Sequence, residues 1–113
     1  LPGLNIKSAM KHIGGREAIY LKFLASFQSS YQEGLFNLSN IYQNQDVSTT
    51  IGTVHSLKGI CGSLGAESAA EKAGEIEALL NKGKKPEINE KLLILEDELK
   101  QILDMVDTLL LSQ

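Results

Sequence analysis

Apolar residues recur three and four positions apart along most of the chain, which is the spacing of one face of an α-helix. The pattern is clearest near the C-terminus, where an unbroken stripe comprises Ile88, Leu92, Leu95, Leu99, Ile102, Val106 and Leu109. We find no convincing strand pattern. A stripe of this kind belongs to a helical bundle or a coiled coil, so the sequence predicts an all-α protein.

The first two predicted helices differ in length. A short helix follows the capping residue Asn5 and stops at Gly14-Gly15. A long helix then continues on a stripe of aromatic and aliphatic residues to Ile41 or Tyr42, and Gly34 marks a point where this helix could bend.

Three further helices complete the predicted fold. One spans about 47–64, between the N-cap Asp46 and the stop signal Gly65. The next begins at the capping box Ser68-Ala69-Ala70-Glu71, and the last carries the C-terminal stripe. Four long helices with short loops are expected to form an antiparallel up-and-down four-helix bundle, with the short additional N-terminal helix as a lid.

Length and composition place the chain among small domains. Its 113 residues suit a single domain over 1–113, in which Leu1-Pro2-Gly3 is typical of a connector and residues 1–4 are assigned to a linker. The net charge is −3 with both signs dispersed, so we expect no nucleic-acid partner. No apolar run approaches the roughly 18 residues of a membrane span, so direct membrane contact is not expected either.

Cysteine content adds one constraint. The single cysteine, Cys61, excludes an internal disulfide framework and fits a reducing compartment. It falls on the core side of the helix predicted over about 47–64, where we expect a small buried hydrophobic residue.

The stretch GTVHSLKGICGSLGA, residues 52–66, is apolar and periodic enough for a buried helix yet contains four glycines. At about 100° per residue, Gly52, Gly59 and Gly62 all fall within about 60° of His55. The opposite face is apolar and comprises Leu57, Ile60, Cys61 and Leu64. Glycine costs a helix interior about 1 kcal/mol relative to alanine, so three of them around an outward histidine indicate close approach of another surface.

An exposed imidazole in this position has few chemical uses. His55 has no histidine, cysteine or carboxylate three or four residues away, so a metal site is not expected. Ser56 points about 100° from His55, which disfavours a hydrolase triad. A nucleophilic role remains, because neutral imidazole is nucleophilic at pH 7 and Lys58, one turn away, can neutralise an added phosphoryl group. The other histidine, His12, is expected on the surface of the first helix.

The residues His55-Ser56-Leu57-Lys58-Gly59 and Gly62-Ser63-Leu64-Gly65-Ala66 closely resemble the signature of histidine-containing phosphotransfer (HPt) domains. The Gly14-Gly15 turn and the all-helical layout extend this resemblance over nearly the whole chain. The chain departs from the family at Asp46-Val47, where members often have a bulkier aromatic residue after the aspartate.

The resemblance implies that His55 accepts a phosphoryl group, that Lys58 is its electrostatic partner, and that Gly59 admits the partner protein. The family shuttles phosphoryl groups between aspartates of receiver domains without ATP-binding machinery, so no ATP-dependent kinase activity is expected of this chain. The receiver would bring the aspartate and Mg²⁺, and no cofactor or metal of its own is expected. The predicted docking patch comprises Ser48, Ile51, Gly52, Gly59 and Gly62, although Ile51 could instead tuck against the second helix.

Two other classes of function stay open. The same bundle could serve as a helical interaction module that transfers nothing, and the C-terminal stripe could belong to a dimerisation domain. The leading interpretation is a monomeric, cytoplasmic phosphorelay module, either the HPt domain of a hybrid sensor histidine kinase tethered at the inner membrane or a free-standing relay protein.

Overall fold

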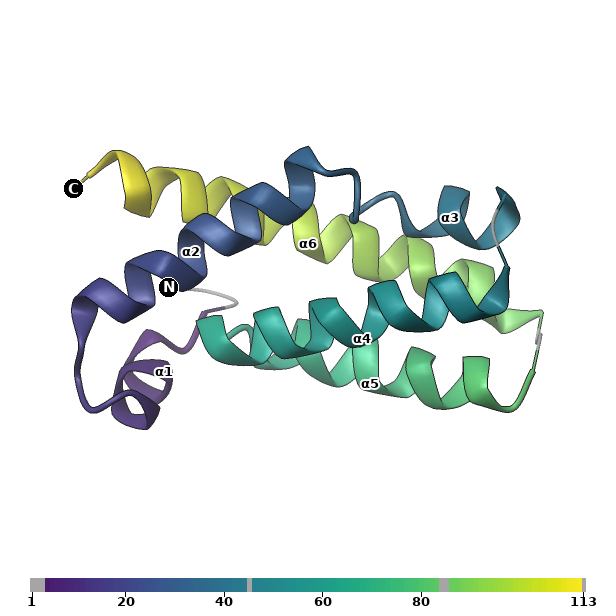
Figure 1. Cartoon of the computed structure of the whole chain (residues 1–113), viewed down its shortest axis with the longest axis horizontal. Helices are drawn as coiled ribbons and strands as arrows, with labels where there is room; N and C mark the ends of the chain where they lie inside the picture. The colour runs from purple at the N-terminus through teal and green to yellow at the C-terminus, as the bar shows by residue number, and fades with distance from the viewer. Residues whose placement is uncertain (1–3, 45, 84–85, 113) are drawn as a thin grey trace.

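The computed structural model describes residues 4–44, 46–83 and 86–112 of the chain. Its helices are α1 (Ile6–His12), α2 (Glu17–Gln32), α3 (Leu38–Asn44), α4 (Val47–Leu64), α5 (Glu67–Asn81) and α6 (Glu87–Leu111). Helices α2, α4, α5 and α6 run alternately in opposite directions along the long axis and pack in a ring, α2 on α4, α4 on α5, α5 on α6 and α6 on α2 (Figure 1). The predicted all-α, antiparallel up-and-down four-helix bundle is therefore confirmed.

Local capping explains where two of the helices begin. The Asn5 side chain accepts a hydrogen bond from the backbone N–H of Ser8 at 3.1 Å and starts α1. Asp46 accepts one from the N–H of Thr49 at 2.7 Å and starts α4. This hydrogen bond favours the ionised carboxylate, so it lowers the pKa of Asp46. Both caps agree with the sequence prediction, as do the bounds of α4.

The long second helix of the sequence prediction is wrong, because the structure divides it into α2 and α3. Gly34 adopts φ +82°, a left-handed conformation that ends a helix rather than bending it. The N–H of Leu35 then donates to the carbonyl of Ser30 at 3.0 Å. In the segment that follows α2, Phe36 is buried in the core, and the centroid of its ring lies 4.9 Å from that of Phe27. An aromatic core contact thus accompanies the interruption.

The predicted capping box at the start of α5 is also wrong. Helix α5 begins at Glu67, with Ala66 as an N-cap that has no side-chain hydrogen bond. The turn after α4 has only two residues, Gly65 and Ala66. Ala66 is buried, and its N–H donates to the carbonyl of Cys61 at 2.9 Å. Ser68 therefore lies inside the helix, where its hydroxyl accepts from the Lys72 ammonium at 2.8 Å.

The core lies along the bundle axis and draws on the loops as well as the helices. The α6 stripe is buried as predicted, except that Leu109 at its end is partly exposed. Leu4, which the sequence prediction assigned to the linker, is buried in this core, while residues 1–3 lie outside the described part. The largest fully buried side chains are Phe27, Leu24, Leu38, Leu57, Leu64, Ile76, Leu80, Ile88, Leu92, Leu95, Leu99 and Ile102.

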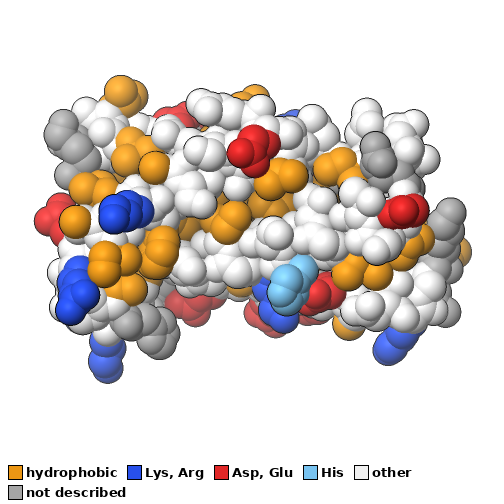
Figure 2. Space-filling model, in the orientation of Figure 1, with side chains coloured by type: hydrophobic (Ala, Val, Ile, Leu, Met, Phe, Trp, Pro, Cys, Tyr) orange, Lys and Arg blue, Asp and Glu red, His pale blue; other side chains and the backbone are white. Residues whose placement is uncertain are grey.

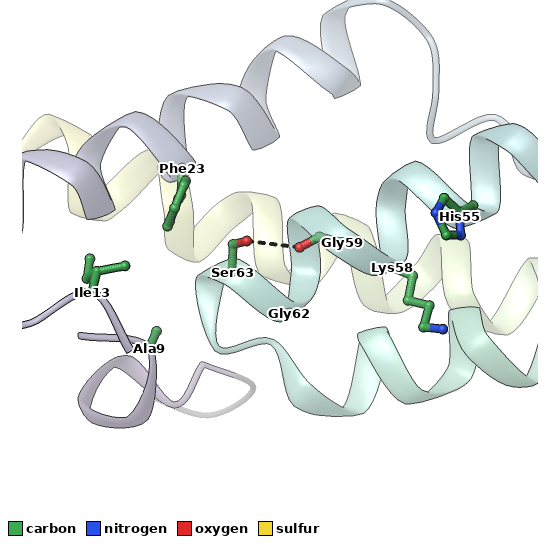
Figure 3. Close-up of a pocket in the computed structure, with 8 residues that line it drawn as sticks. All are labelled: Ala9, Ile13, Phe23, His55, Lys58, Gly59, Gly62 and Ser63. Carbon is green, nitrogen blue, oxygen red and sulfur yellow. Dashed lines mark hydrogen bonds between the residues drawn. The ribbon is translucent and has the colours of Figure 1, made fainter. Parts of the chain in front are cut away.

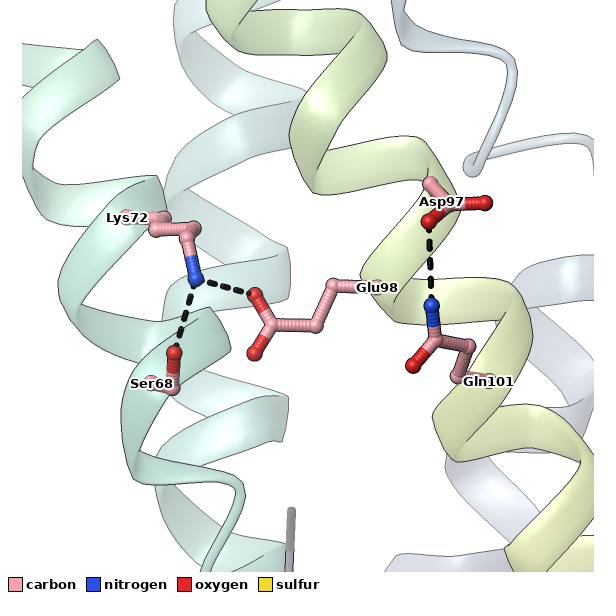
Figure 4. Close-up of polar contacts among 5 residues, drawn as sticks. All are labelled: Ser68, Lys72, Asp97, Glu98 and Gln101. Carbon is pink, nitrogen blue, oxygen red and sulfur yellow. Dashed lines mark hydrogen bonds and ion pairs between the residues drawn. The ribbon is translucent and has the colours of Figure 1, made fainter.

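An ion pair joins α5 to α6. The Lys72 ammonium lies 2.8 Å from the Glu98 carboxylate, and Ser68 completes the contact (Figure 4). Lys72 therefore connects two helices of the bundle.

Two hydrogen bonds hold the N-terminal part of the chain against the end of α4. The Asn5 N–H donates to the Gly65 carbonyl at 2.7 Å, and the Tyr20 hydroxyl donates to the Leu64 carbonyl at 2.7 Å. A Cβ atom at Gly65 would overlap the Asn5 carbonyl, so glycine is required there. Helix α1 and the start of α2 are thereby placed beside the C-terminal half of α4. None of the helices in the described ranges is long and apolar enough to cross a membrane.

Candidate functional site

Helix α4 has one buried face and one face turned to solvent. Val54, Leu57, Cys61 and Leu64 are fully buried, whereas the side chain of His55 is 69% exposed. This position agrees with the helical wheel. Ile60, at the edge of the apolar face, is partly exposed. The side chain of His12, the other histidine, lies outside the described part of the molecule.

Cys61 is unsuited to nucleophilic chemistry. Burial, with a smaller contribution from the charge of Glu98, raises the pKa of its thiol to about 12. The reactive thiolate is therefore scarce at neutral pH, and Cys61 acts as a small core residue, as the sequence predicts.

The three outward glycines of α4 stand in open space. A Cβ atom added at Gly52, Gly59 or Gly62 would meet no atom within 4 Å outside the local helix, and none of the three has a positive φ. Neither packing nor backbone conformation in this chain requires glycine there. This contrasts with Gly65, where the chain itself leaves no room for a side chain.

An open hollow of about 420 Å³ lies beside His55, between α4 and the N-terminal helices (Figure 3). Helix α4 supplies the polar side of the lining, and α1 and α2 supply apolar side chains. The lining residues are Ala9, Ile13, Phe23, His55, Lys58, Gly59, Gly62 and Ser63. Four candidates from the sequence, His55, Lys58, Gly59 and Gly62, therefore meet at one depression.

A second hollow of about 460 Å³ adjoins the first and shares Phe23, Gly59 and Ser63 with it. Apolar side chains follow the seam between α2 and α4 on this face (Figure 2). Among the described residues that line the two hollows, Lys58 is the only lysine, and none is acidic. The surface beside the histidine is thus mostly uncharged.

Phe23 is a residue that the sequence analysis missed. It is partly exposed, packs on the core and lines both hollows. On the wheel of α2 it lies between the buried Tyr20 and Phe27 on one side and the exposed Ser26 on the other, and this boundary position gave Phe23 no distinctive signal.

The imidazole of His55 contacts a carboxylate from the neighbouring helix. Its Nδ1 lies 2.7 Å from Oε2 of Glu77 on α5. The other oxygen, Oε1, lies 3.6 Å from the Lys58 ammonium, so Glu77 contacts both candidate residues. Glu77 is 22 positions from His55 in sequence, and no local spacing relates the two.

Lys58 reaches Glu77 by crossing the surface of α5. A Cβ atom at Gly74 would lie 3.5 Å from Cε of Lys58, an ordinary van der Waals distance. The Lys58 side chain is 48% exposed and that of Glu77 is 18% exposed, so the carboxylate is the most sheltered of the three groups. The site therefore consists of the sheltered carboxylate of Glu77 in contact with the exposed imidazole of His55 and the half-exposed ammonium of Lys58.

The remaining docking candidates lie outside the two hollows. Ser48 and Gly52 are exposed on α4, toward its N-terminus. Ile51 is partly buried and packs against the hydrophobic core. The described residues contain no group of three or more histidine, cysteine, aspartate or glutamate side chains arranged to hold a metal ion.

Comparison with known proteins identifies the family. The model of the Hpt domain family matches residues 22–109, so the chain belongs to the Hpt domain family. Hpt domains take part in phosphotransfer within two-component phosphorelays and interact with receiver domains.

A solved structure agrees with this assignment at the level of the fold. The HPT domain of the Hpt sensor hybrid histidine kinase from Shewanella is 21% identical, with a TM-score of 0.87, and the alignment covers 98% of this chain and 96% of that one. A search of curated proteins finds no match.

Proposed function

We propose that His55 accepts a phosphoryl group from an aspartate of one receiver domain and passes it to an aspartate of another. The observation that carries the proposal is an exposed imidazole beside Lys58 on a helix face whose glycines have no packing role. In a chain of the Hpt family, that face is suited to a protein that must reach the ring nitrogen.

The proposed step is an in-line displacement at phosphorus. A ring nitrogen of His55 attacks the phosphorus atom, a nitrogen–phosphorus bond forms, and the bond from phosphorus to the aspartate oxygen breaks. The receiver keeps its carboxylate, and the reverse reaction with a second receiver regenerates the imidazole. Such a reaction depends on positioning and charge neutralisation, and the ammonium of Lys58, which contacts the same Glu77 carboxylate as His55, would supply the latter.

We expect the receiver to rest on the mostly uncharged surface around Gly59 and Gly62. The two hollows beside these glycines offer apolar contacts from Phe23 and space for protruding side chains. Ser48 and Gly52 would extend the contact toward the N-terminus of α4. The proposal takes the chain as one monomeric domain in the cytoplasm, with Mg²⁺ held by the receiver.

An experiment with a phosphorylated receiver tests the site. Wild-type protein is incubated with the receiver, and acid-labile phosphate on this chain is measured over time. His55→Gln should reduce transfer at least about a thousandfold, because no other described side chain replaces the nucleophile. Lys100→Gln, which changes an exposed side chain on α6 that lines neither hollow, is the control and should transfer normally.

If the chain is instead an interaction module that transfers nothing, no phosphate should appear on the wild-type chain. Binding of receivers without phosphate on the wild-type chain would favour that alternative. Transfer that persists in His55→Gln would instead show that the acceptor was misassigned.

A further inference from the structure

We propose that Arg16 and Lys22, two cations at the edge of the hollows beside His55, attract the acidic face of a receiver domain and speed its docking on this surface. The inference rests on the proposed function and deepens it, because it concerns the partner of the same site. Neither residue belongs to the histidine motif or to the predicted docking patch.

Charge is distributed unevenly between the N-terminal segment and the rest of the chain. Of the 14 acidic residues, only Glu17 lies within residues 4–32, although the net charge of the whole chain is −3. Basic side chains gather at the end of the molecule that α1 and the start of α2 occupy (Figure 2). The basic residues of this segment are Lys7, Lys11, Arg16 and Lys22.

Two of these four cations lie beside residues that line the hollows. Lys22 is an exposed residue of α2, one helical turn before Ser26 and next to Phe23, and both of these line the second hollow. The N–H of Arg16 donates to the carbonyl of Ile13 at 3.4 Å, and Ile13 lines the first hollow. A positive charge therefore stands at the edge of each hollow, on the side of α1 and α2.

The two lysines of α1 are placed differently. On a helical wheel Lys7 and Lys11 each fall about 160° from Ala9, which is buried and lines the first hollow. Their side chains are on the face of α1 opposite to this surface. They add to the positive field at this end of the molecule, but they are not placed to meet a protein docked over His55.

Arg16 and Lys22 have no partner among the described residues. Neither side chain takes part in an ion pair or a hydrogen bond there, whereas Lys58 and Lys72 both contact carboxylates. A partner that met the two cations would not have to break an internal contact of the bundle. The surface between them is mostly uncharged, so these two charges dominate the field along this edge.

The chemistry of the proposed partner supplies the opposite charge. A phosphoryl group carries about two negative charges near neutral pH, which is enough to balance one Mg²⁺. The receiver holds that Mg²⁺ through carboxylates, the usual protein ligands of the ion, and these carry further negative charge. The face of the receiver around its aspartate is therefore acidic, and it is complementary to the cations beside the hollows.

Charges at the rim of an interface act mainly on the association rate and its dependence on salt. Neither Arg16 nor Lys22 lines the hollow that contains His55, so they should not change the transfer step itself. The expected signature is a slower association at low salt that disappears at high salt, where the Debye length falls to about 3 Å.

The test uses a fluorescently labelled receiver domain that binds the wild-type chain, and stopped-flow mixing gives its association rate. At about 0.1 M salt, the double variant Arg16→Gln/Lys22→Gln should associate about fivefold more slowly than the wild type. At about 1 M salt the two proteins should differ by less than about twofold. Transfer at saturating receiver should be unchanged under both conditions.

The control makes the same change in net charge elsewhere. Lys82→Gln/Lys100→Gln alters exposed residues at the end of α5 and on α6, and neither lines a hollow beside His55. This variant should associate at nearly the wild-type rate. Glu17→Gln removes the acidic residue of the N-terminal segment and should raise the association rate, which tests the sign of the effect.

Equal association rates for the two double variants at low salt would overturn the inference, and transfer by the wild type would then leave the proposed function intact. A loss for Arg16→Gln/Lys22→Gln that persists at high salt would also overturn it, because that result indicates a change in local packing. If receivers associate with the expected salt dependence but leave no phosphate on the chain, the proposed function fails and the guiding role is supported.

Discussion

The two faces of α4 differ in how their residues pack: one is buried in the core and the other is open to solvent. The inner face carries Val54, Leu57, Cys61 and Leu64, all without exposed surface. The outer face carries His55 among glycines whose missing side chains would touch nothing. Selection for stability explains the inner face, because each buried apolar group contributes to folding. It does not explain the outer face, where alanine would make a more stable helix.

The glycines at the end of α4 sharpen this contrast. Gly65 is needed by the fold, since it adopts φ +84° and approaches the Asn5 backbone. Gly59 and Gly62 lie only a few residues away, yet no feature of the described chain excludes a side chain from them. The same residue type therefore serves the fold at one position and, by our proposal, the partner at the others.

The largest expected effect is on the inner face. Leu57→Ala should lower the free energy of unfolding by about 3 kcal/mol, since it removes a fully buried side chain and leaves a cavity. Chemical denaturation measures the loss. The folded fraction should still transfer phosphate at nearly the wild-type rate, and a transfer defect larger than the folding defect would show that the two faces are coupled.

On the outer face, Gly59→Glu should leave the free energy of unfolding within about 0.5 kcal/mol of the wild-type value, because the site is open. Transfer should fall about a hundredfold, as the new side chain blocks the approach to His55. The kinetics of transfer and a denaturation curve together test this prediction. Gly59→Gln is the neutral control of similar size, and normal transfer by this variant would mean that charge, not bulk, is the obstacle.

Lys58→Ala should slow transfer about tenfold without changing the fold, because it removes a half-exposed positive charge. Lys58→Arg should retain most of the rate. Lys100→Ala on α6 makes the same change in net charge away from the site and serves as a control measured under the same salt conditions. A similar loss for both alanine variants would point to a general charge effect.

The smallest expected effect comes from Gly62→Ala. It should raise the free energy of unfolding by up to about 1 kcal/mol, since alanine is the better helix residue and its Cβ meets no neighbour. Thermal or chemical unfolding measures this gain. Unchanged transfer would remove Gly62 from the docking surface, whereas slower transfer by a more stable protein would place it there.

Much of the fold could be predicted because the signals are local. Asn5 and Asp46 start helices through hydrogen bonds to residues three positions later, and Gly65 stops α4 through its own backbone conformation. The orientation of His55 also follows from spacing within one helix. Gly34 is a position where local signals were insufficient. The sequence suggested a bend, whereas in the structure the helix ends there and Phe36 packs against Phe27 in the core.

Contacts between helices could not be predicted in the same way. Glu77 meets His55 because the two-residue turn at Gly65-Ala66 sets the register of α5 against α4, and that register depends on how both helices pack in the core. Phe23 reaches the same surface for a similar reason, since the position of α2 depends on the break at Gly34 and on the contacts of Tyr20.

By itself, then, the sequence determined the all-helical class, the caps at Asn5 and Asp46 and the face on which His55 stands, because these depend on interactions a few residues apart. Only the tertiary structure decided which carboxylate lies against the imidazole and which side chains border it. Such neighbours come from distant segments, and the angle and register between helices are set by the whole core rather than by any local pattern.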